Sequence, residues 1–320
     1  MTAELWFSLA ALPAALALLI LASDYFLTGA IGLAGRLDLP EFVVGSIIVA
    51  VGTSAPELAI NIAAGLTGQG DIVISNLVGS NIVNICLGIG LAGLFVRYAA
   101  IGANYGRALL VGLAAAVGLA ALTLITSAGG QSVVPRWAGI VLTILFAVYV
   151  WQSFRAGGEE GDADGEISAG AKSLPVCIAL VLGGAVAMAF LADLAVDSAV
   201  DISTFLGIPE AVIGATVIAA GGSLPEIFSC IAAARQGRPN IVLGNIAGSQ
   251  LFNLLGILGI TALIAEVQFS SHLAIDMGVL IVGTVLLLAF AAAPAGRKLL
   301  PAALLSVYGL YGGYLVYVSV

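Results

Sequence analysis

The stretch Ala50-Val51-Gly52-Thr53-Ser54-Ala55-Pro56-Glu57 returns later in the chain as Ala219-Ala220-Gly221-Gly222-Ser223-Leu224-Pro225-Glu226. Both stretches belong to a longer internal repeat, in which residues 40–90 match residues 209–259 at a constant offset of 169 without a gap. Of the 51 compared positions, 20 are identical. Self-similarity of this length indicates a chain built from two related halves. The matched positions include polar residues inside apolar sequence, where packing alone would favour Leu, Ala or Gly.

The sequence around this repeat has the composition of an integral membrane protein. Of its 320 residues, 61% are hydrophobic and 9% are charged, whereas soluble domains have about 45–50% and about 25%. This composition excludes a soluble enzyme, a nucleic-acid-binding protein and a disordered chain. The apolar runs are continuous, which disfavours a β-barrel because barrel strands alternate apolar and polar residues.

The apolar runs predict an all-α membrane protein with ten transmembrane helices, since a bilayer core about 30 Å thick needs roughly 20 apolar residues per helix. The expected spans are residues 5–34, 40–66, 71–96, 104–126, 135–155, 173–204, 209–234, 240–265, 272–294 and 299–319. Each repeated residue lies five helices from its counterpart, so the second copy must cross the membrane in the opposite direction. We therefore predict two inverted five-helix repeats, residues 1–155 and 173–320, joined by an acidic cytoplasmic linker at 156–172. Inverted repeats are typical of secondary transporters, whose site lies at the repeat interface.

Basic residues predict the orientation, because Lys and Arg favour cytoplasmic loops. With the N-terminus outside, Arg136 falls on the outer side and the other nine basic residues fall on the inner side. These nine are Arg36, Arg97, Arg107, Arg155, Lys172, Arg235, Arg238, Arg297 and Lys298. We therefore expect a multi-pass protein of the plasma membrane with both termini outside the cytoplasm.

Each repeat carries a proline inside a predicted span, Pro56 in the second helix and Pro225 in the seventh. Proline lacks an N–H and bends a helix, which frees carbonyl oxygens about one turn earlier. The third and eighth helices add neutral oxygens four residues apart, and so on one helix face: Ser80 with Asn84, and Ser249 with Asn253. Irregular backbone at membrane depth survives only where protein buries it or where it lines a cavity. The second, third, seventh and eighth helices are therefore expected to be kinked around a central ion site.

Glu57 and Glu226 determine the chemistry expected of this site. A carboxylate near the bilayer centre costs several kcal/mol unless it is paired, protonated or coordinating a cation. These segments contain no Lys or Arg near either glutamate. Two carboxylates match the charge of one divalent cation, and oxygen-only ligands favour Ca²⁺ over softer transition metals, although the same oxygens also suit several Na⁺ ions. The structural alternative is a pair of protonated glutamates that serve as hydrogen-bonded spacers.

The blocks GTSAPEL…GSNIVN (52–84) and GGSLPEI…GSQLFN (221–253) closely resemble the two signature repeats of the sodium/calcium exchanger family, of prokaryotic type, in the cation/calcium exchanger superfamily. The resemblance covers roughly 100 residues in the two repeats, and the inverted layout extends it to the whole chain. It implies an antiporter, not an enzyme, that exchanges Ca²⁺ for Na⁺ by alternating access and needs no cofactor. Such a protein works within the lipid bilayer, and a monomer is sufficient for this activity. The resemblance implies neither a nucleic-acid partner nor a protein partner.

The resemblance also implies an ion ligand set, in which Glu57 and Glu226 are the central carboxylates shared by Ca²⁺ and Na⁺. The other implied ligands are the hydroxyl or carbonyl groups of Thr53, Ser54, Ser80, Ser223 and Ser249, the main-chain carbonyls of Ala50 and Ala219, and the amides of Asn84 and Asn253. Two positions depart from the family pattern. Gly222 replaces the threonine that would match Thr53, so only its backbone is available as a ligand. Asn253 stands where some relatives carry an aspartate associated with a K⁺-coupled or protonatable site, which disfavours K⁺ co-transport.

Two other functions stay open. A proton-coupled antiporter of Ca²⁺ or another cation would use the same glutamates to carry H⁺, although that branch usually has a Gly-Asn…Glu block instead of Ser-x-Pro-Glu. A passive cation channel is disfavoured by inverted repeats and paired deep carboxylates. Asp24, Asp193 and Asp197, in the long first and sixth helices, are expected to line a vestibule or bond neighbouring helices rather than bind the ion.

Overall fold

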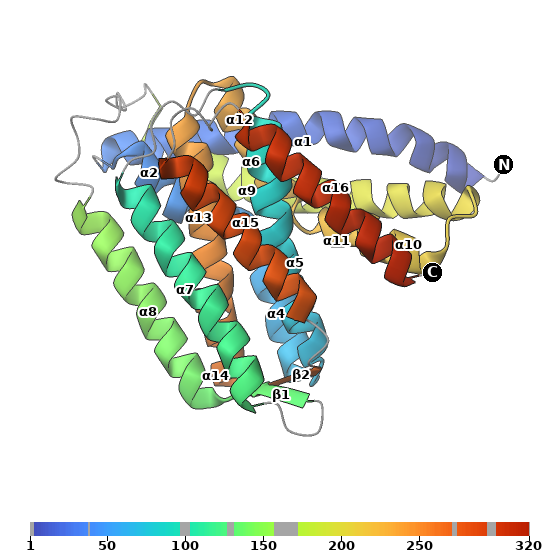
Figure 1. Cartoon of the computed structure of the whole chain (residues 1–320). Helices are drawn as coiled ribbons and strands as arrows, with labels where there is room; N and C mark the ends of the chain where they lie inside the picture. Colours follow the sequence, from blue (N-terminus) through green and yellow to red (C-terminus); the bar gives the residue numbers. More distant parts are fainter. Residues whose placement is uncertain are drawn as a thin grey trace.

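A computed structural model of the chain describes residues 3–37, 39–96, 103–126, 131–156, 172–270, 274–292 and 299–319. Most of these residues are helical, as Figure 1 shows. In the described part, seven helices are long and apolar enough to cross a membrane, or eight if one bent pair is a single span. The expectation of a helical membrane protein is therefore confirmed. The acidic linker lies outside the described residues except at its two ends.

The N-terminal half contains one long helix, one broken helix and three further helices with a short strand. In chain order the elements, with π-helical segments marked η, are α1 (Ala3–Arg36), α2 (Glu41–Val43), η1 (Val44–Val49), α3 (Ala50–Thr53), α4 (Ala55–Leu66), α5 (Gly70–Val83), η2 (Asn84–Gly88), α6 (Ile89–Ala92), α7 (Ala103–Thr126), β1 (Gln131–Val134) and α8 (Arg136–Ala156). Single π-helical turns inside α-helices are frequent at functional sites.

The C-terminal half has its helices in the same order, but its strand follows the third helix instead of the fourth. Its elements are α9 (Leu174–Phe205), α10 (Glu210–Ile213), η3 (Gly214–Ile218), α11 (Ala219–Gly221), α12 (Leu224–Arg235), α13 (Pro239–Leu251), η4 (Phe252–Ile257), α14 (Leu258–Ile264), β2 (Val267–Ser270), α15 (Ala274–Ala292) and α16 (Leu300–Ser319). At the offset of 169, η1 corresponds to η3 and η2 to η4 to within one residue. The two halves therefore share their helical irregularities as well as their sequence.

The two long helices α1 and α9 lie side by side and run crosswise to α7 and α8 (Figure 1). Glycines allow their close approach, as small residues do between membrane helices. A β-carbon at Gly29 would lie 2.7 Å from the Leu180 β-carbon, and one at Gly184 would lie 2.7 Å from the Phe26 β-carbon. By contrast, the helix that runs from α13 to α14 is deeply enclosed, with every residue from Ile241 to Ile257 buried. This helix forms the centre of the molecule.

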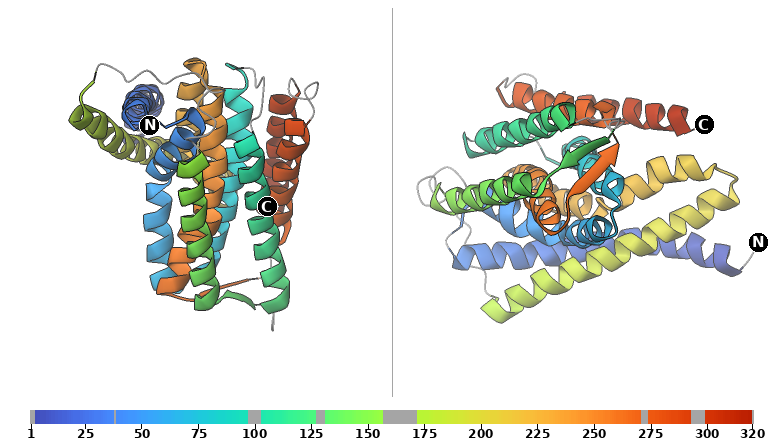
Figure 2. Two further views of the ribbon diagram at one scale, coloured as in Figure 1. Left: turned by 90° about the vertical axis from the view of Figure 1, so that its left-hand side faces the viewer. Right: turned by 90° about the horizontal axis from the view of Figure 1, so that it is seen from below.

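Two short strands, β1 and β2, were not expected in an all-helical protein. They pair antiparallel, with Gln131 opposite Ser270 and Val134 opposite Val267, and lie together at the lower end of the molecule (Figures 1 and 2). The Ser270 backbone N–H and Oγ donate to the two oxygens of Asp71, at 2.5 and 3.0 Å, which joins the sheet to the start of α5. The pairing connects loops far apart in sequence, so no local pattern indicates it.

Candidate cation site

Two helix breaks, one in each half, position the predicted acidic residues. The helical segment Glu41–Thr53 ends at Ser54, and the segment Ala55–Leu66 continues at an angle of 49°. Ser54 has φ −87° and ψ 13°, and its repeat counterpart Ser223 has φ −94° and ψ 6° between α11 and α12. Each following helix has its proline in the first turn, where the missing N–H leaves no helical bond unmade. Ser54 lies two residues before Pro56, and Ser223 lies two residues before Pro225.

Glu57 and Glu226 occupy the first turns of α4 and α12, directly after the breaks. Their side chains are 1% and 0% exposed. The unbonded N–H groups at a helix N-terminus carry partial positive charge, which stabilises a nearby carboxylate. The two carboxylates also repel each other. The site therefore places two negative charges in a buried environment, where their electrostatic attraction for a bound cation is strongest.

A direct hydrogen bond joins the two halves at this point. Ser54 Oγ donates to Glu226 Oε1 at 2.7 Å. The surrounding elements also join the two halves. Both α12 and α13, from the C-terminal half, contact α3 and η2 of the N-terminal half, and they contact each other. The tertiary structure thus brings together segments from residues 50–53, 84–88, 224–235 and 239–251.

Seven buried side-chain oxygens at the predicted site positions have no hydrogen-bond partner among the described residues. They are both oxygens of Glu57, Oε2 of Glu226, Oγ of Ser223 and Ser249, and Oδ1 of Asn84 and Asn253. Leaving one such group unpaired costs about 1–3 kcal/mol, and more where the group is charged. Within the described part of the chain, no group of three or more His, Cys, Asp or Glu residues gathers to hold a metal. A cation held here must therefore rely on two carboxylates together with neutral oxygens, a donor set that suits Ca²⁺ or Na⁺.

The remaining predicted ligands differ in their surroundings, and two of them already make hydrogen bonds within the protein. Thr53 Oγ1 donates to the carbonyl oxygens of Val49 and Ala50, at 3.1 and 3.3 Å, so its hydroxyl is already engaged with the expected carbonyl ligand Ala50. Ser80 Oγ lies 3.4 Å from Asn76 Oδ1, a long hydrogen bond. Ala219 opens α11, one turn before the break at Ser223.

A cavity of about 770 Å³ reaches the predicted site between α5 on one side and α9, η3 and α11 on the other. Ser80 and Gly222 line it, together with the acidic residues Asp71, Asp193 and Asp197. A β-carbon at Gly222 would meet no described heavy atom within 4 Å, so the missing threonine side chain leaves room in the cavity. Asp193 and Asp197 thus line a vestibule, as predicted.

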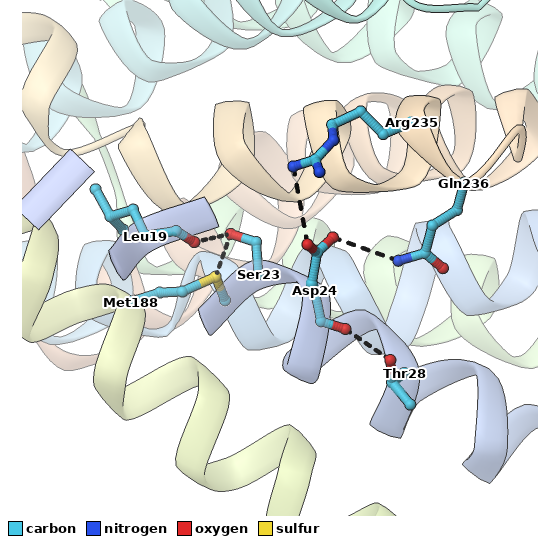
Figure 3. A network of polar contacts seen from close by, with 7 residues as sticks. All are labelled: Leu19, Ser23, Asp24, Thr28, Met188, Arg235 and Gln236. Atoms are coloured by element: carbon cyan, nitrogen blue, oxygen red, sulfur yellow. Dashed lines mark hydrogen bonds and ion pairs between the residues drawn. The ribbon is translucent and has the colours of Figure 1, made fainter. Parts of the chain in front are cut away.

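Asp24, the repeat counterpart of Asp193, bonds a neighbouring helix instead (Figure 3). Its Oδ2 lies 3.8 Å from Arg235 Nη1, and its Oδ1 accepts a 3.5 Å hydrogen bond from Gln236 Nε2. At the preceding residue of α1, Ser23 Oγ donates to the Met188 sulfur at 3.1 Å, which links α1 to α9. Equivalent aspartates of the two halves therefore have different surroundings.

Asn76 and Asn245 extend the polar face of the site and were not among the predicted ligands. Each lies four residues before a predicted serine, so that Asn76, Ser80 and Asn84 follow one face of the helix formed by α5 and η2, and their counterparts follow the helix formed by α13 and η4. Asn245 Nδ2 donates to the Cys230 sulfur at 3.3 Å, while its Oδ1 is buried without a described partner. The same four-residue spacing, extended one turn toward the N-terminus from each predicted serine, would have identified both residues.

Comparison with known proteins agrees with this geometry. The pattern of the family described as sodium/calcium exchanger protein matches residues 7–155 and 176–320. The putative antiporter CaxA of Alkalimonas amylolytica is 33% identical over 256 residues, 78% of each chain. The sodium/calcium exchanger MaX1 of Methanosarcina acetivorans is 31% identical over 289 residues, 78% of this chain and 80% of the relative.

A solved structure also matches along nearly the whole length. The sodium-calcium exchanger NCX_Mj, soaked with 2.5 mM Na⁺ and 10 mM Sr²⁺, superposes with a TM-score of 0.78 at 28% identity. The match covers 96% of this chain and 98% of that one. With the family pattern present in both halves and the repeat-related breaks at the site, the chain belongs to the sodium/calcium exchanger family.

Proposed function

We propose that the protein is a secondary-active antiporter that exchanges Ca²⁺ for Na⁺ across the plasma membrane by alternating access. The observation that carries this proposal is the set of buried, unpartnered oxygens around Glu57 and Glu226, reached by an acidic cavity. The relatives MaX1 and NCX_Mj, both described as sodium/calcium exchangers, support Na⁺ as the counter-ion.

Charge balance explains how the two ions are coupled. One Ca²⁺ neutralises Glu57 and Glu226, and Na⁺ ions on the same oxygens neutralise them equally, so the two loads compete. An empty site would leave two carboxylates buried without counter-ions, which is too costly during reorientation. Only filled sites then cross, and leak is suppressed. The proposed ligands are the set implied by the sequence resemblance: Glu57, Glu226, Thr53, Ser54, Ser223, Ser80, Ser249, Asn84, Asn253, Ala50 and Ala219.

The proposed topology has ten crossings in two inverted repeats, residues 1–155 and 173–320, joined by the cytoplasmic linker 156–172. Support comes from contacts among the predicted inner ends. Arg36 Nε donates to the Lys172 carbonyl oxygen at 3.2 Å, and Arg238 pairs with Glu41. The first contact joins the end of α1 to the residues just before α9, and the second joins the start of α2 to the residue just before α13. With both termini outside, the start of α5 faces outward, and the cavity beside Asp71 opens to the exterior.

Uptake of Ca²⁺ into vesicles that contain the purified protein tests the proposal. An outward Na⁺ gradient should drive uptake, and dissipating that gradient with a Na⁺ ionophore should stop it. The same vesicles with an H⁺ gradient and no Na⁺ provide the matched comparison. Uptake that follows H⁺ and ignores Na⁺ would replace this proposal with proton-coupled antiport. Uptake that needs neither counter-ion and does not saturate would indicate a channel.

A further inference from the structure

Away from the cavity, two helices of different halves pack through glycines. A β-carbon at Gly45 in η1 would overlap the Ile241 carbonyl oxygen of α13 and would lie 2.9 Å from the Asn245 nitrogen. A β-carbon at Gly248 would overlap the Ser46 carbonyl oxygen. Contacts this close to backbone leave no room for any side chain. The η1–α13 contact is therefore sealed.

This sealed contact lies on the other side of the site from the cavity. The chain enters the first broken helix at α2 and η1, passes the break at Ser54, and leaves at the end of α4. The next helix, α5, begins beside the end of α4, with which it is in contact. The cavity borders α5 from Asp71 to Ser80, whereas the sealed contact involves η1, on the other side of the break at Ser54, so the site lies between them.

The offset of 169 maps the sealed contact onto the cavity. Gly45 corresponds to Gly214 and Gly248 to Gly79, while Ile241 and Asn245 correspond to Ile72 and Asn76. Gly214, Gly79, Ile72 and Asn76 all line the cavity of about 770 Å³. A β-carbon at Gly79 or Gly214 would meet no described heavy atom within 4 Å. The same pair of surfaces is thus closed on one side of the site and open on the other.

We propose that Gly79 and Gly214 form the contact surface of a second gate, which is open in this structure and closes in the alternate state. This inference rests on the proposed alternating access. Two halves with related sequences can exchange conformations, and η3 would then close on α5 as η1 now closes on α13. In the state described here nothing lies against either position, so this state does not require a glycine there. The closed state is the one that requires glycine at both positions.

One position departs from the symmetry and refines the proposal. Gly244, whose β-carbon would lie 2.6 Å from the Phe42 carbonyl oxygen, corresponds to Ser75 in α5. A serine at this place does not allow equally close backbone contact. The second gate should therefore close tightly at Gly79 and Gly214 and remain wider at Ser75.

The variants Gly79→Ala and Gly214→Ala test this gate. Their added methyl groups enter open space in the present state and meet backbone in the alternate state. The matched control is Gly183→Ala in α9, whose β-carbon also meets nothing described within 4 Å. Its repeat counterpart is Ala14, so exchanged conformations already accommodate a methyl group there. Gly248→Ala is the opposite variant, since it opposes the closed contact seen here.

Two readouts separate gate closure from ion binding. The first is Ca²⁺ uptake into vesicles, with Ca²⁺ binding to the purified variants measured by calorimetry. The second is labelling of Ser46→Cys by a membrane-permeant maleimide, in a chain whose three native cysteines are replaced by alanine. Ser46 is 2% exposed in the sealed contact, so its labelling reports the alternate state.

Gly79→Ala and Gly214→Ala should each slow uptake and Ser46→Cys labelling by about tenfold or more, as overpacking of a tight contact does, with Ca²⁺ binding retained. Gly183→Ala should behave as the unaltered chain, and Gly248→Ala should increase labelling. Wild-type labelling and uptake in both test variants, or loss of Ca²⁺ binding by both, would overturn the gate. Absence of Na⁺-driven exchange in the unaltered chain would instead reject the proposed function, while the labelling results would still test the gate.

Discussion

Ser54 Oγ donates a 2.7 Å hydrogen bond to Glu226 Oε1, whereas the reciprocal pair, Ser223 and Glu57, is not bonded. Ser223 Oγ and both carboxylate oxygens of Glu57 are buried without a partner in the described part of the chain. Two halves with nearly the same local sequence are thus in unequal states at the site. Unequal states of equivalent elements are what an alternating-access transporter needs, since exchanging them exposes the site to the other side.

The two serines are expected to differ in their effect on stability. Ser54→Ala leaves Glu226 Oε1 without its partner, and should lower the free energy of unfolding by about 1–3 kcal/mol. Ser223→Ala removes a hydroxyl without a described partner and should change this free energy by less than about 0.5 kcal/mol. Thermal unfolding in detergent with a Ca²⁺ chelator measures both. Equal losses would contradict the unequal pairing.

Glu57→Gln and Glu226→Gln should each abolish Ca²⁺ transport while leaving the ion-free protein at least as stable as before, because each removes an uncompensated buried charge. Calorimetric Ca²⁺ affinity should fall by more than about 100-fold, beyond the usual effect of losing a second-layer partner. Transport retained by either single variant would refute a site shared between the two carboxylates.

Calcium should stabilise the folded protein by mass action. At a free concentration of 100 times the dissociation constant, the gain is about 2.7 kcal/mol, visible as a higher unfolding temperature that a chelator reverses. Mg²⁺ is the control ion, since it gives up its waters reluctantly and should stabilise much less. Glu57→Gln should show no Ca²⁺-dependent shift. Equal stabilisation by Mg²⁺ would argue against a Ca²⁺ site built from protein oxygens.

Asp193 and Asp197 should attract cations to the cavity without binding them at the site. The double variant Asp193→Asn, Asp197→Asn should raise the KM for Ca²⁺ by about tenfold at low ionic strength, with the maximal rate unchanged. The effect should shrink near 0.15 M salt, where the Debye length is about 8 Å. Asp24→Asn serves as the matched control, because Asp24 faces Arg235 rather than the cavity. A salt-independent change would point to direct ligation instead.

Asn253→Asp adds a third carboxylate to the buried site. The extra negative charge calls for an additional monovalent ion, so K⁺ or H⁺ should stimulate Ca²⁺ uptake in this variant more than in the unaltered chain. Asn84→Asp, at the counterpart position, is the matched comparison. Uptake should be measured with K⁺ replaced by choline and over a range of pH. An unchanged response to both ions would show that the residue at 253 does not govern coupling.

The helical membrane fold could be predicted, and the centre of the candidate site could be proposed, because both depend on patterns along the chain. Continuous apolar runs define membrane helices, and the offset of 169 relates Ser54 to Ser223 and Glu57 to Glu226. Prolines at fixed places in both copies predict the breaks. The pairing of β1 with β2 escaped prediction, because it joins backbone groups of two loops more than 130 residues apart and leaves no periodic signal. Asn76 and Asn245 were not predicted as ligands, because the four-residue spacing was applied only from each serine to the asparagine that follows it and not to the residue four positions before.

The chain's residues alone settle which groups are available: two carboxylates, a set of hydroxyls and amides, and glycines at equivalent positions of both halves. They do not settle which half is closed. Gly45 and Gly214 have similar sequence neighbours, yet one is pressed against backbone and the other borders a cavity. Related sequences have the same local preferences, so the difference arises from packing between the halves. In this structure the interface between the halves makes the contact at Gly45 and leaves Gly214 beside the cavity.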